Sequence, residues 1–192
     1  MSPIKSVQAR SVWDSRGCPT VEAVVTLVDG TQASAIAPAG ASTGSGEARE
    51  LRDGGTALKG LGVKAAVEAT HQILAPAIVG MDITDQAGID RAMQAADGTP
   101  DKSRVGGNSM IAVSLACLWA ASKQAGQPLW QYLRADNVAA LPLPEIQIFG
   151  GGAHAKGSVD LQDFLVVANG ATRFEQALEW TAEIYLAAGK ML

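Results

Sequence analysis

The periodicity of the apolar residues changes after the first 37 residues, and this change constrains the fold more than any other feature. Residues 4–13 alternate apolar and polar side chains, and residues 20–28 are rich in β-branched ones; both patterns are typical of strands. Asp29-Gly30 separates the second run from residues 31–37, and an Asp-Gly pair in that position predicts a type I′ hairpin turn. The chain is therefore expected to begin with an antiparallel meander of three strands.

Helical periodicity replaces this alternation after a glycine-rich stretch. The expected helices cover residues 62–80, 84–98, 108–126 and 128–134. Pro76 is expected to kink or end the first of them, Thr84 or Asp85 is expected to cap the second, and Asn108 is expected to cap the third.

The pattern shifts again near residue 136. Residues 140–149 and 164–168 are predicted strands on either side of a flexible glycine-rich loop, and residues 174–192 are a predicted amphipathic helix that follows a Thr172–Glu175 capping box. Two strands and one helix cannot close a sheet or cover both faces of an apolar strand. We therefore expect a complete α+β domain at residues 1–135 and the beginning of a second domain at residues 136–192.

Composition limits the possible partners. Of the 192 residues, 47% are hydrophobic and 18% are charged, a balance typical of globular proteins. The net charge of −4 argues against a nucleic-acid partner. The longest apolar run, residues 110–121, is shorter than the about 20 residues that span a bilayer, and the N-terminus lacks a signal peptide. A cytoplasmic protein is expected, with Cys18 and Cys117 as free thiols.

The stretch APAGASTGSG at residues 37–46 fails both nucleotide-binding tests. It has no lysine for a Walker loop, and Arg49 stands where a dinucleotide fingerprint needs its third glycine. Two interpretations remain: a flexible connection, or a mobile loop that carries oxygen donors. The residues of this candidate loop are Gly40, Ala41, Ser42, Thr43 and Gly44.

Two histidines and two strand-end carboxylates are the next candidates. His154 lies in a glycine-rich loop, where a core role is absent, so function is favoured; His71 lies on a predicted helix and is expected to be structural. Asp160 and Asp163 precede a predicted strand, where each is either a site acid or a solvated strand end.

Charged residues elsewhere have simpler explanations. Glu22 interrupts an apolar strand and either faces solvent or pairs across a subunit contact. The cluster between the glycine-rich stretch and the first helix is expected to be a self-compensating surface; its members are Glu47, Arg49, Glu50, Arg52 and Asp53.

Collinear motifs over nearly the whole chain resemble the enolase family. They are DSRGCPTVEAVV, APAGASTGSGEARELRDGG, VGGNSMIAVSLA and GGGAHAKGSVDLQDFLVV. The resemblance implies a small α+β cap domain followed by an α/β barrel. It also implies reversible dehydration of 2-phosphoglycerate to phosphoenolpyruvate, a step of glycolysis and gluconeogenesis, with two Mg²⁺ ions that stabilise an enolate. A homodimer or higher oligomer is implied as well.

The resemblance assigns roles to five residues of this chain. Ser42 matches a serine that reaches the second metal ion when the loop closes. His154 matches the histidine of another mobile loop over the substrate and is expected to be both catalytic and substrate-binding, and Gln162 matches a substrate-side glutamine. Asp163 stands where the family has a catalytic glutamate. Glu22 matches a residue that pairs with an arginine at the dimer interface.

The departures from the family pattern limit this assignment. Asp163 is one methylene shorter than glutamate, Gly150 and Cys18 each replace an asparagine, and Ala153 varies the loop. The chain ends before the family's proton-abstracting lysine, its other catalytic glutamate and its three carboxylate metal ligands, so the isolated chain is expected to be inactive. The alternatives are a non-catalytic enolase-like protein and a related enzyme that acts on another carboxylate.

Overall fold

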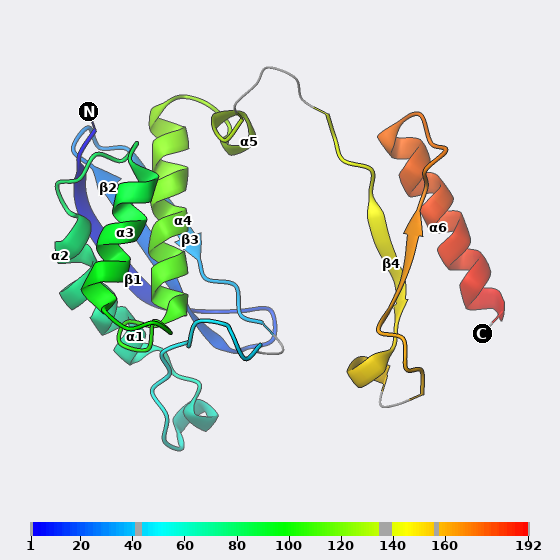
Figure 1. The fold of residues 1–192 in the computed structure, drawn as a ribbon, viewed down its shortest axis with the longest axis horizontal. Helices are drawn as coiled ribbons and strands as arrows, with labels where there is room; N and C mark the ends of the chain where they lie inside the picture. The colour runs from blue at the N-terminus through cyan, green and yellow to red at the C-terminus, as the bar shows by residue number, and fades with distance from the viewer. Residues whose placement is uncertain (1, 41–43, 135–139, 156–157, 192) are drawn as a thin grey trace. The chain divides into compact units, whose positions relative to one another are not determined.

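Three antiparallel strands begin the chain in the computed structural model, which describes residues 2–40, 44–134, 140–155 and 158–191 (Figure 1). The chain divides into two compact units, Met1–Ala135 and Asp136–Leu192, called here the N-terminal and C-terminal units. In the N-terminal unit the strands are β1 (Ile4–Trp13), β2 (Pro19–Leu27) and β3 (Gln32–Ile36), and they lie in sequence order. The predicted meander is confirmed.

The turn between β2 and β3 differs from the prediction. Gly30 N–H donates to the Leu27 carbonyl at 3.1 Å, which makes Val28 and Asp29 the central residues of the turn. Neither has a positive φ, whereas Gly30 has a φ of 88°, so the turn is not type I′. A β-branched valine is strained at positive φ, and the left-handed position therefore falls on the glycine that follows.

The helices of the N-terminal unit follow the sheet in the chain. They are α1 (Lys64–Ala69), α2 (Ala75–Ile78), α3 (Gln86–Asp97), α4 (Gly107–Gln124) and α5 (Leu129–Tyr132), with a 3₁₀ turn η1 (Ala57–Gly60) before them. Asp85 caps α3 through a bond from Gly88 N–H at 2.9 Å, as predicted.

Pro76 deforms its helix without ending it. The turn η2 (Thr70–Leu74), between α1 and α2, is a π-helix, and the helical path continues past Pro76 to Ile78. A proline inside a helix lacks an N–H and crowds the carbonyl four residues before it. A widened π turn relieves that crowding.

The core of the N-terminal unit lies between the sheet and α4. This helix packs on β2 and β3, and its alanines recur every fourth residue at Ala112, Ala116 and Ala120, all fully buried. Small side chains on one face let the helix approach the sheet closely. Cys117 lies in the same core, where burial raises the pKa of its thiol to about 12; both cysteines are free.

The C-terminal unit is an antiparallel strand pair followed by one helix. Its elements are β4 (Glu145–Gly150), the 3₁₀ turn η3 (Gly152–Ala155), β5 (Asp163–Val167) and α6 (Phe174–Met191). Thr172 N–H bonds to Gln176 Oε1 at 2.9 Å, so the predicted capping box with Glu175 is wrong: the helix begins one residue later than that box requires. No closed barrel is present among the described residues.

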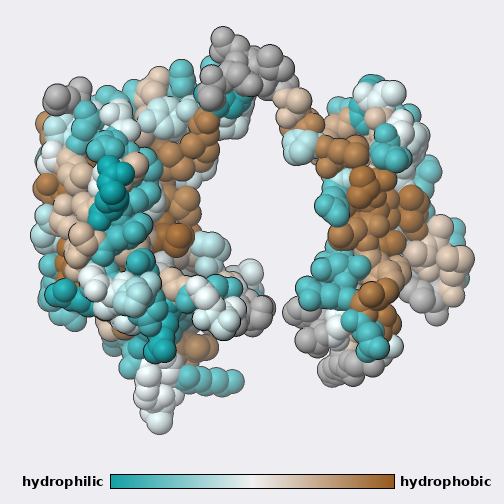
Figure 2. All heavy atoms as spheres, viewed as in Figure 1, coloured by the Kyte–Doolittle hydropathy of each residue, from teal (hydrophilic) through white to brown (hydrophobic). Residues whose placement is uncertain are grey.

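Large apolar side chains remain exposed on the C-terminal unit (Figure 2). Within α6 only Ala177 and Thr181 are buried. The exposed large apolar side chains of α6 are Phe174, Leu178, Trp180, Ile184, Tyr185, Leu186 and Met191. In the described part of the chain, every helix is too short or too polar to cross a membrane.

Candidate functional site

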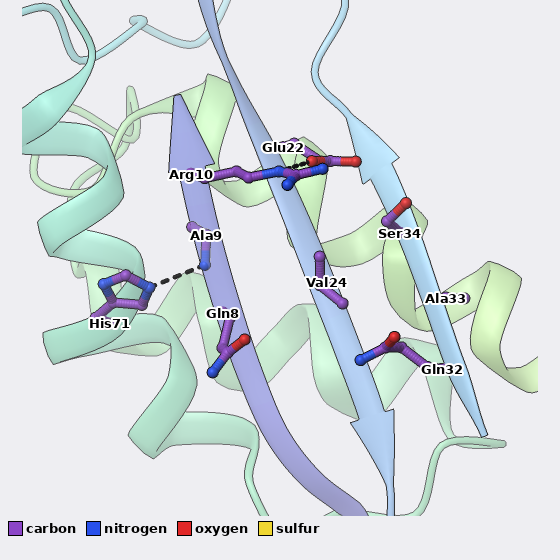
Figure 3. A pocket seen from close by; sticks show the side chains of 9 residues that line it. All are labelled: Gln8, Ala9, Arg10, Glu22, Val24, Gln32, Ala33, Ser34 and His71. Atoms are coloured by element: carbon purple, nitrogen blue, oxygen red, sulfur yellow. Dashed lines mark hydrogen bonds and ion pairs between the residues drawn. The ribbon is translucent and has the colours of Figure 1, made fainter. Parts of the chain in front are cut away.

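Glu22 lies on the outer face of the sheet, on the side away from the helices. It is mostly buried and forms an ion pair with Arg10, its register partner on β1 (Figure 3). A pocket of about 590 Å³ opens beside this pair. The predicted solvent-facing or intersubunit glutamate is therefore paired within its own chain. Arg10 was not identified from the sequence as a partner of Glu22. Once the turn that joins β1 and β2 is known, counting residues along the two strands places Arg10 opposite Glu22.

His71 borders the same pocket from the π-helical turn. Its Nε2 accepts the Ala9 N–H of β1 at 2.9 Å (Figure 3). Because Nε2 accepts, the proton of the neutral ring is on Nδ1. β1 is an edge strand, and this bond satisfies one of its outward N–H groups. The expected structural role of His71 is confirmed.

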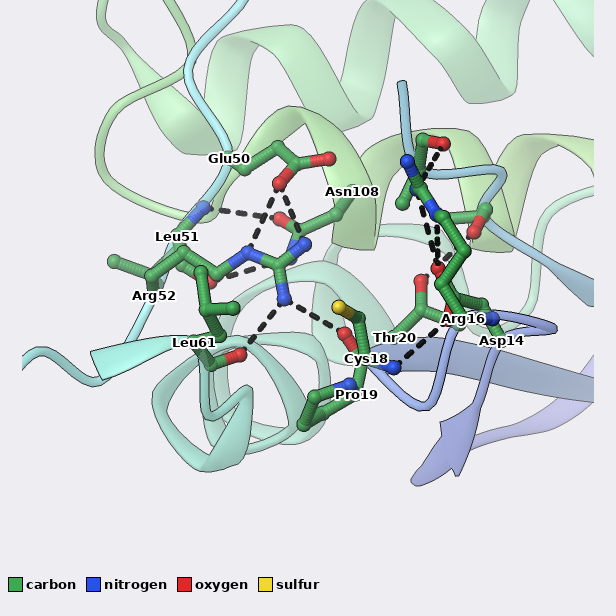
Figure 4. Close-up of polar contacts among 12 residues, drawn as sticks. Asp14, Arg16, Cys18, Pro19, Thr20, Glu50, Leu51, Arg52, Leu61 and Asn108 are labelled. Atoms are coloured by element: carbon green, nitrogen blue, oxygen red, sulfur yellow. Dashed lines mark hydrogen bonds and ion pairs between the residues drawn. The ribbon is translucent and has the colours of Figure 1, made fainter. Parts of the chain in front are cut away.

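The N-terminal base of the glycine-rich stretch is fixed by three hydrogen bonds. Ala37 N–H donates to Val21 O at 2.9 Å, and Thr20 Oγ1 donates to Ala37 O at 2.7 Å. Arg16 Nη2 donates to Ala39 O at 2.8 Å (Figure 4). The stretch therefore leaves the sheet in a defined direction.

Asp14 holds Arg16 in place for this contact. Its Oδ1 accepts the N–H groups of Cys18 and Arg16, each at 2.8 Å, and Oδ2 pairs with the guanidinium at 3.2 Å. The bond from Cys18 contributes most to lowering the pKa of Asp14, partial burial opposes it, and the bonds from Arg16 add to the lowering.

The C-terminal base is fixed by the start of α4. Asn108 accepts the Leu51 N–H at 3.1 Å and donates to the Leu51 carbonyl at 3.2 Å, while Gly107 N–H donates to Arg49 O at 2.7 Å. Asn108 lies inside α4, which begins at Gly107, so its predicted role as a cap is wrong. Its amide matches the two backbone groups of one residue and pins the segment (Figure 4).

Arg52 shows that the charged cluster is more than a solvated surface. Its Nη2 pairs with Glu50 at 2.6 Å, but its Nη1 also donates to the carbonyls of Pro19 and Leu61, at 2.7 and 2.8 Å (Figure 4). Asp53 accepts the Ala65 N–H at 2.8 Å at the start of α1. The prediction of self-compensating charges was therefore only partly right.

The centre of the glycine-rich stretch, Ala41, Ser42 and Thr43, lies outside the described residues. Its neighbours Gly40 and Gly44 are described, and Gly44 O accepts the Glu47 N–H at 3.2 Å. The assignment of Ser42 to a metal ion stays a prediction.

Asp163 and Gln162 lie together where the loop of the C-terminal unit enters β5. Asp163 is the first residue of β5 and pairs in register with Gly150. Its Oδ1 accepts from Gln147 Nε2 at 2.7 Å, and its Oδ2 from Gln162 Nε2 at 3.4 Å. His154 is in η3, and its side chain lies outside the described part. Gln147 was not predicted, because nothing local in the sequence links it to residue 163.

Two glycines close the loop that carries these residues. Gly151 N–H donates to Gln162 O at 2.6 Å, and Gly152 N–H donates to Val159 O at 2.7 Å. A Cβ on Gly151 would overlap the Leu161 carbonyl oxygen. These two hydrogen bonds tie the start of the glycine-rich loop, Gly151 and Gly152, to residues 159–162.

The described residues do not form a metal centre. No group of three or more His, Cys, Asp or Glu side chains in the part of the chain that the structure describes could hold a metal ion. Asp14 accepts backbone N–H groups and pairs with Arg16, and Asp53 accepts the N–H groups of Lys64 and Ala65.

The fold and the site define a two-domain class, in which an α+β cap is followed by the first elements of a second domain with a polar loop at its strand ends. Residues 4–133 match the family model of the enolase N-terminal domain, and residues 138–192 match that of the enolase C-terminal TIM barrel domain. The chain belongs to the enolase family. This is a family of lyases, and the matches cover both compact units.

Proposed function

We propose that the chain is the N-terminal part of a phosphopyruvate hydratase, which interconverts 2-phosphoglycerate and phosphoenolpyruvate in the cytoplasm. The observation that carries the proposal is the order of the two enolase domains along the chain, 4–133 and then 138–192. Gln162 and Asp163 also support it, because they lie side by side where the loop between β4 and β5 ends.

Each candidate residue has a role in this reaction. Asp163 assists departure of the hydroxyl group, which requires a carboxylate that can transfer a proton. Gln162 and His154 bind the phosphorylated carboxylate substrate. Mg²⁺ would supply the charge that stabilises the enolate. Among the described residues no group of His, Cys, Asp or Glu side chains could hold the ion, and Ser42 would add an oxygen to it.

We also propose a homodimer in which Glu22 meets an arginine of a second copy. Its ion pair with Arg10 lies on a sheet face that no helix of the N-terminal unit covers. A carboxylate has two oxygens and can accept several hydrogen bonds, so Glu22 can bind a second arginine beside Arg10. Sedimentation of the native protein and of Glu22→Gln tests this: the variant should shift toward monomer.

The reaction is tested on the native protein, expressed from its complete gene. We expect 2-phosphoglycerate to be converted with Mg²⁺ present and conversion to stop when the ion is chelated; the isolated 192-residue chain should give no turnover. Asp163→Asn should lower kcat about 100-fold or more, because general acid–base groups contribute on that order. Asp160→Asn is the matched control, since Asp160 is exposed three residues earlier.

A native protein that leaves 2-phosphoglycerate unchanged in the presence of Mg²⁺ would contradict the proposal. One observation favours a second candidate, a non-catalytic enolase-like protein: Asp163 is shorter than the family glutamate by one methylene. If only Asp163→Glu restores turnover, this second candidate is correct.

A further inference from the structure

We infer that Gln147 is a positioning residue for Asp163. We also infer that Gly150, which has no side chain, leaves room for the amide group of Gln147 beside it. The inference rests on the proposed role of Asp163. Gln147 Nε2 donates to Asp163 Oδ1 at 2.7 Å. That distance is short for an N–H···O bond, as expected where the acceptor is a carboxylate.

The register of the strand pair explains how the two side chains meet. Gln147 is paired with Leu165, and Asp163 is two residues from Leu165, so Gln147 and Asp163 are diagonal neighbours on one face. Diagonal Cβ atoms are roughly 7–8 Å apart, a gap that a long side chain can bridge. The ladder shifts between Gln147 and Phe149, and this irregularity brings Gly150 opposite Asp163.

Gly150 is the third part of the arrangement. A Cβ at this position would lie 3.0 Å from Gln147 Nε2, so the amide would have to move by a few tenths of an ångström. A larger residue at position 150 should therefore shift the donor relative to Asp163. The other contact to the carboxylate, from Gln162, is longer at 3.4 Å, so Gln147 makes the shorter of the two bonds.

The lengths of the two side chains are matched. The glutamine side chain has two methylene groups and the aspartate side chain has one. Replacing Gln147 by asparagine and Asp163 by glutamate leaves the total number of methylene groups between the two backbones unchanged. Gln147→Asn alone should leave the amide too far from the carboxylate for a hydrogen bond. Asp163→Glu alone should bring the carboxylate too close to the amide. The double variant should restore the contact with the amide and carboxylate displaced along the same line.

Kinetics of the native protein, from its complete gene, test the positioning role. Gln147→Ala should lower kcat about 10- to 100-fold, as expected for loss of a hydrogen bond to a charged group. KM should stay within about threefold, because Gln147 contacts Asp163 and not the substrate. Gln147→Asn with Asp163→Glu should recover at least about tenfold over the worse single variant. Glu145→Ala, on the same strand and exposed, is the matched control.

A second measurement does not depend on activity. The side-chain amide resonance of Gln147 should move in Asp163→Ala and in Gly150→Asn, and should stay in place in Glu145→Ala. If wild type is inactive but the resonance moves as expected, the proposed function fails and the contact stands. If wild type is active and Gln147→Ala retains its kcat, or the double variant is no better than the worse single one, or the resonance does not move, the inference is wrong.

Discussion

Asp97 is a buried carboxylate that organises the loop between α3 and α4. It is 1% exposed and accepts hydrogen bonds from Thr99 N–H and Oγ1 and from the N–H groups of Arg104 and Val105. Burial by itself would raise the pKa of this carboxyl, but the bonds from Thr99, Val105 and Arg104 outweigh it and hold the pKa below its ordinary value. The charged form is therefore part of the folded structure.

Asp97→Asn should destabilise the chain in a pH-dependent way. The lowered pKa means that the carboxylate contributes stability above its unfolded pKa of about 3.9, and that this contribution is lost as the pH falls through the lower folded value. We expect a loss of about 2 kcal/mol at pH 7, and a smaller difference from wild type below about pH 4. Urea unfolding across this range measures it, with Glu68→Gln as an exposed control. A difference that is the same at every pH would contradict this account.

Some hydrogen bonds between residues close in sequence were predictable, although the Thr172–Glu175 capping box was not among them, and those with distant partners were not. Asp85 was identified as a cap because it bonds to Gly88, three residues away. Asn108 was assigned a cap by the same reasoning, but its partner is Leu51, 57 residues earlier. Hydrogen bonds between distant segments depend on how the elements pack, and single-residue preferences do not contain that information.

The start of α4 and the segment at Leu51 form a close contact between two elements. Gly106 precedes the helix with a φ of 87°, and a Cβ there would lie 2.7 Å from Leu51 N and would also meet Asn108 Oδ1. Gly126, which follows the same helix, has a φ of 66° and no atom within 4 Å of its would-be Cβ. The two glycines share a positive φ and differ in crowding.

Gly106→Ala should therefore cost more stability than Gly126→Ala. Both variants place an L side chain at positive φ, which costs about 1–3 kcal/mol, and Gly106→Ala adds about 1–3 kcal/mol because the Asn108–Leu51 contact must open. Thermal unfolding of the two variants measures the difference. Equal losses would show that the contact does not crowd the glycine.

The positions of the helices and strands were predicted well from the sequence, and the irregularities within them were predicted poorly. Period-two and helical patterns located β1, β2, α3 and α4, because burial on one face sets those periods. The π turn before Pro76 and the ladder shift after Gln147 were not predicted. Both are local adjustments to neighbouring backbone, and a hydrophobic pattern has the same period with or without them.

The two units differ in how much apolar surface they bury. Nearly all buried apolar side chains belong to Met1–Ala135, and in the described part of Asp136–Leu192 only Ala168 and Ala177 join them. The prediction of only two strands and one helix in this unit indicated that the strands would need more covering than one helix supplies. The sequence could not show which side chains stay exposed, because that depends on where α6 lies over the strand pair.

Residues 1–135, expressed alone, should therefore unfold cooperatively, whereas residues 136–192 alone should not. A three-stranded sheet covered by helices has enough buried area for independent stability, and a single two-stranded hairpin is marginal. Circular dichroism during heating should show a sigmoidal transition for the first piece and a gradual change for the second. The second piece should also bind a hydrophobic dye, through the exposed side chains of α6 such as Tyr185 and Leu186. A sharp transition without dye binding in residues 136–192 would mean that the strand pair and α6 bury a core of their own.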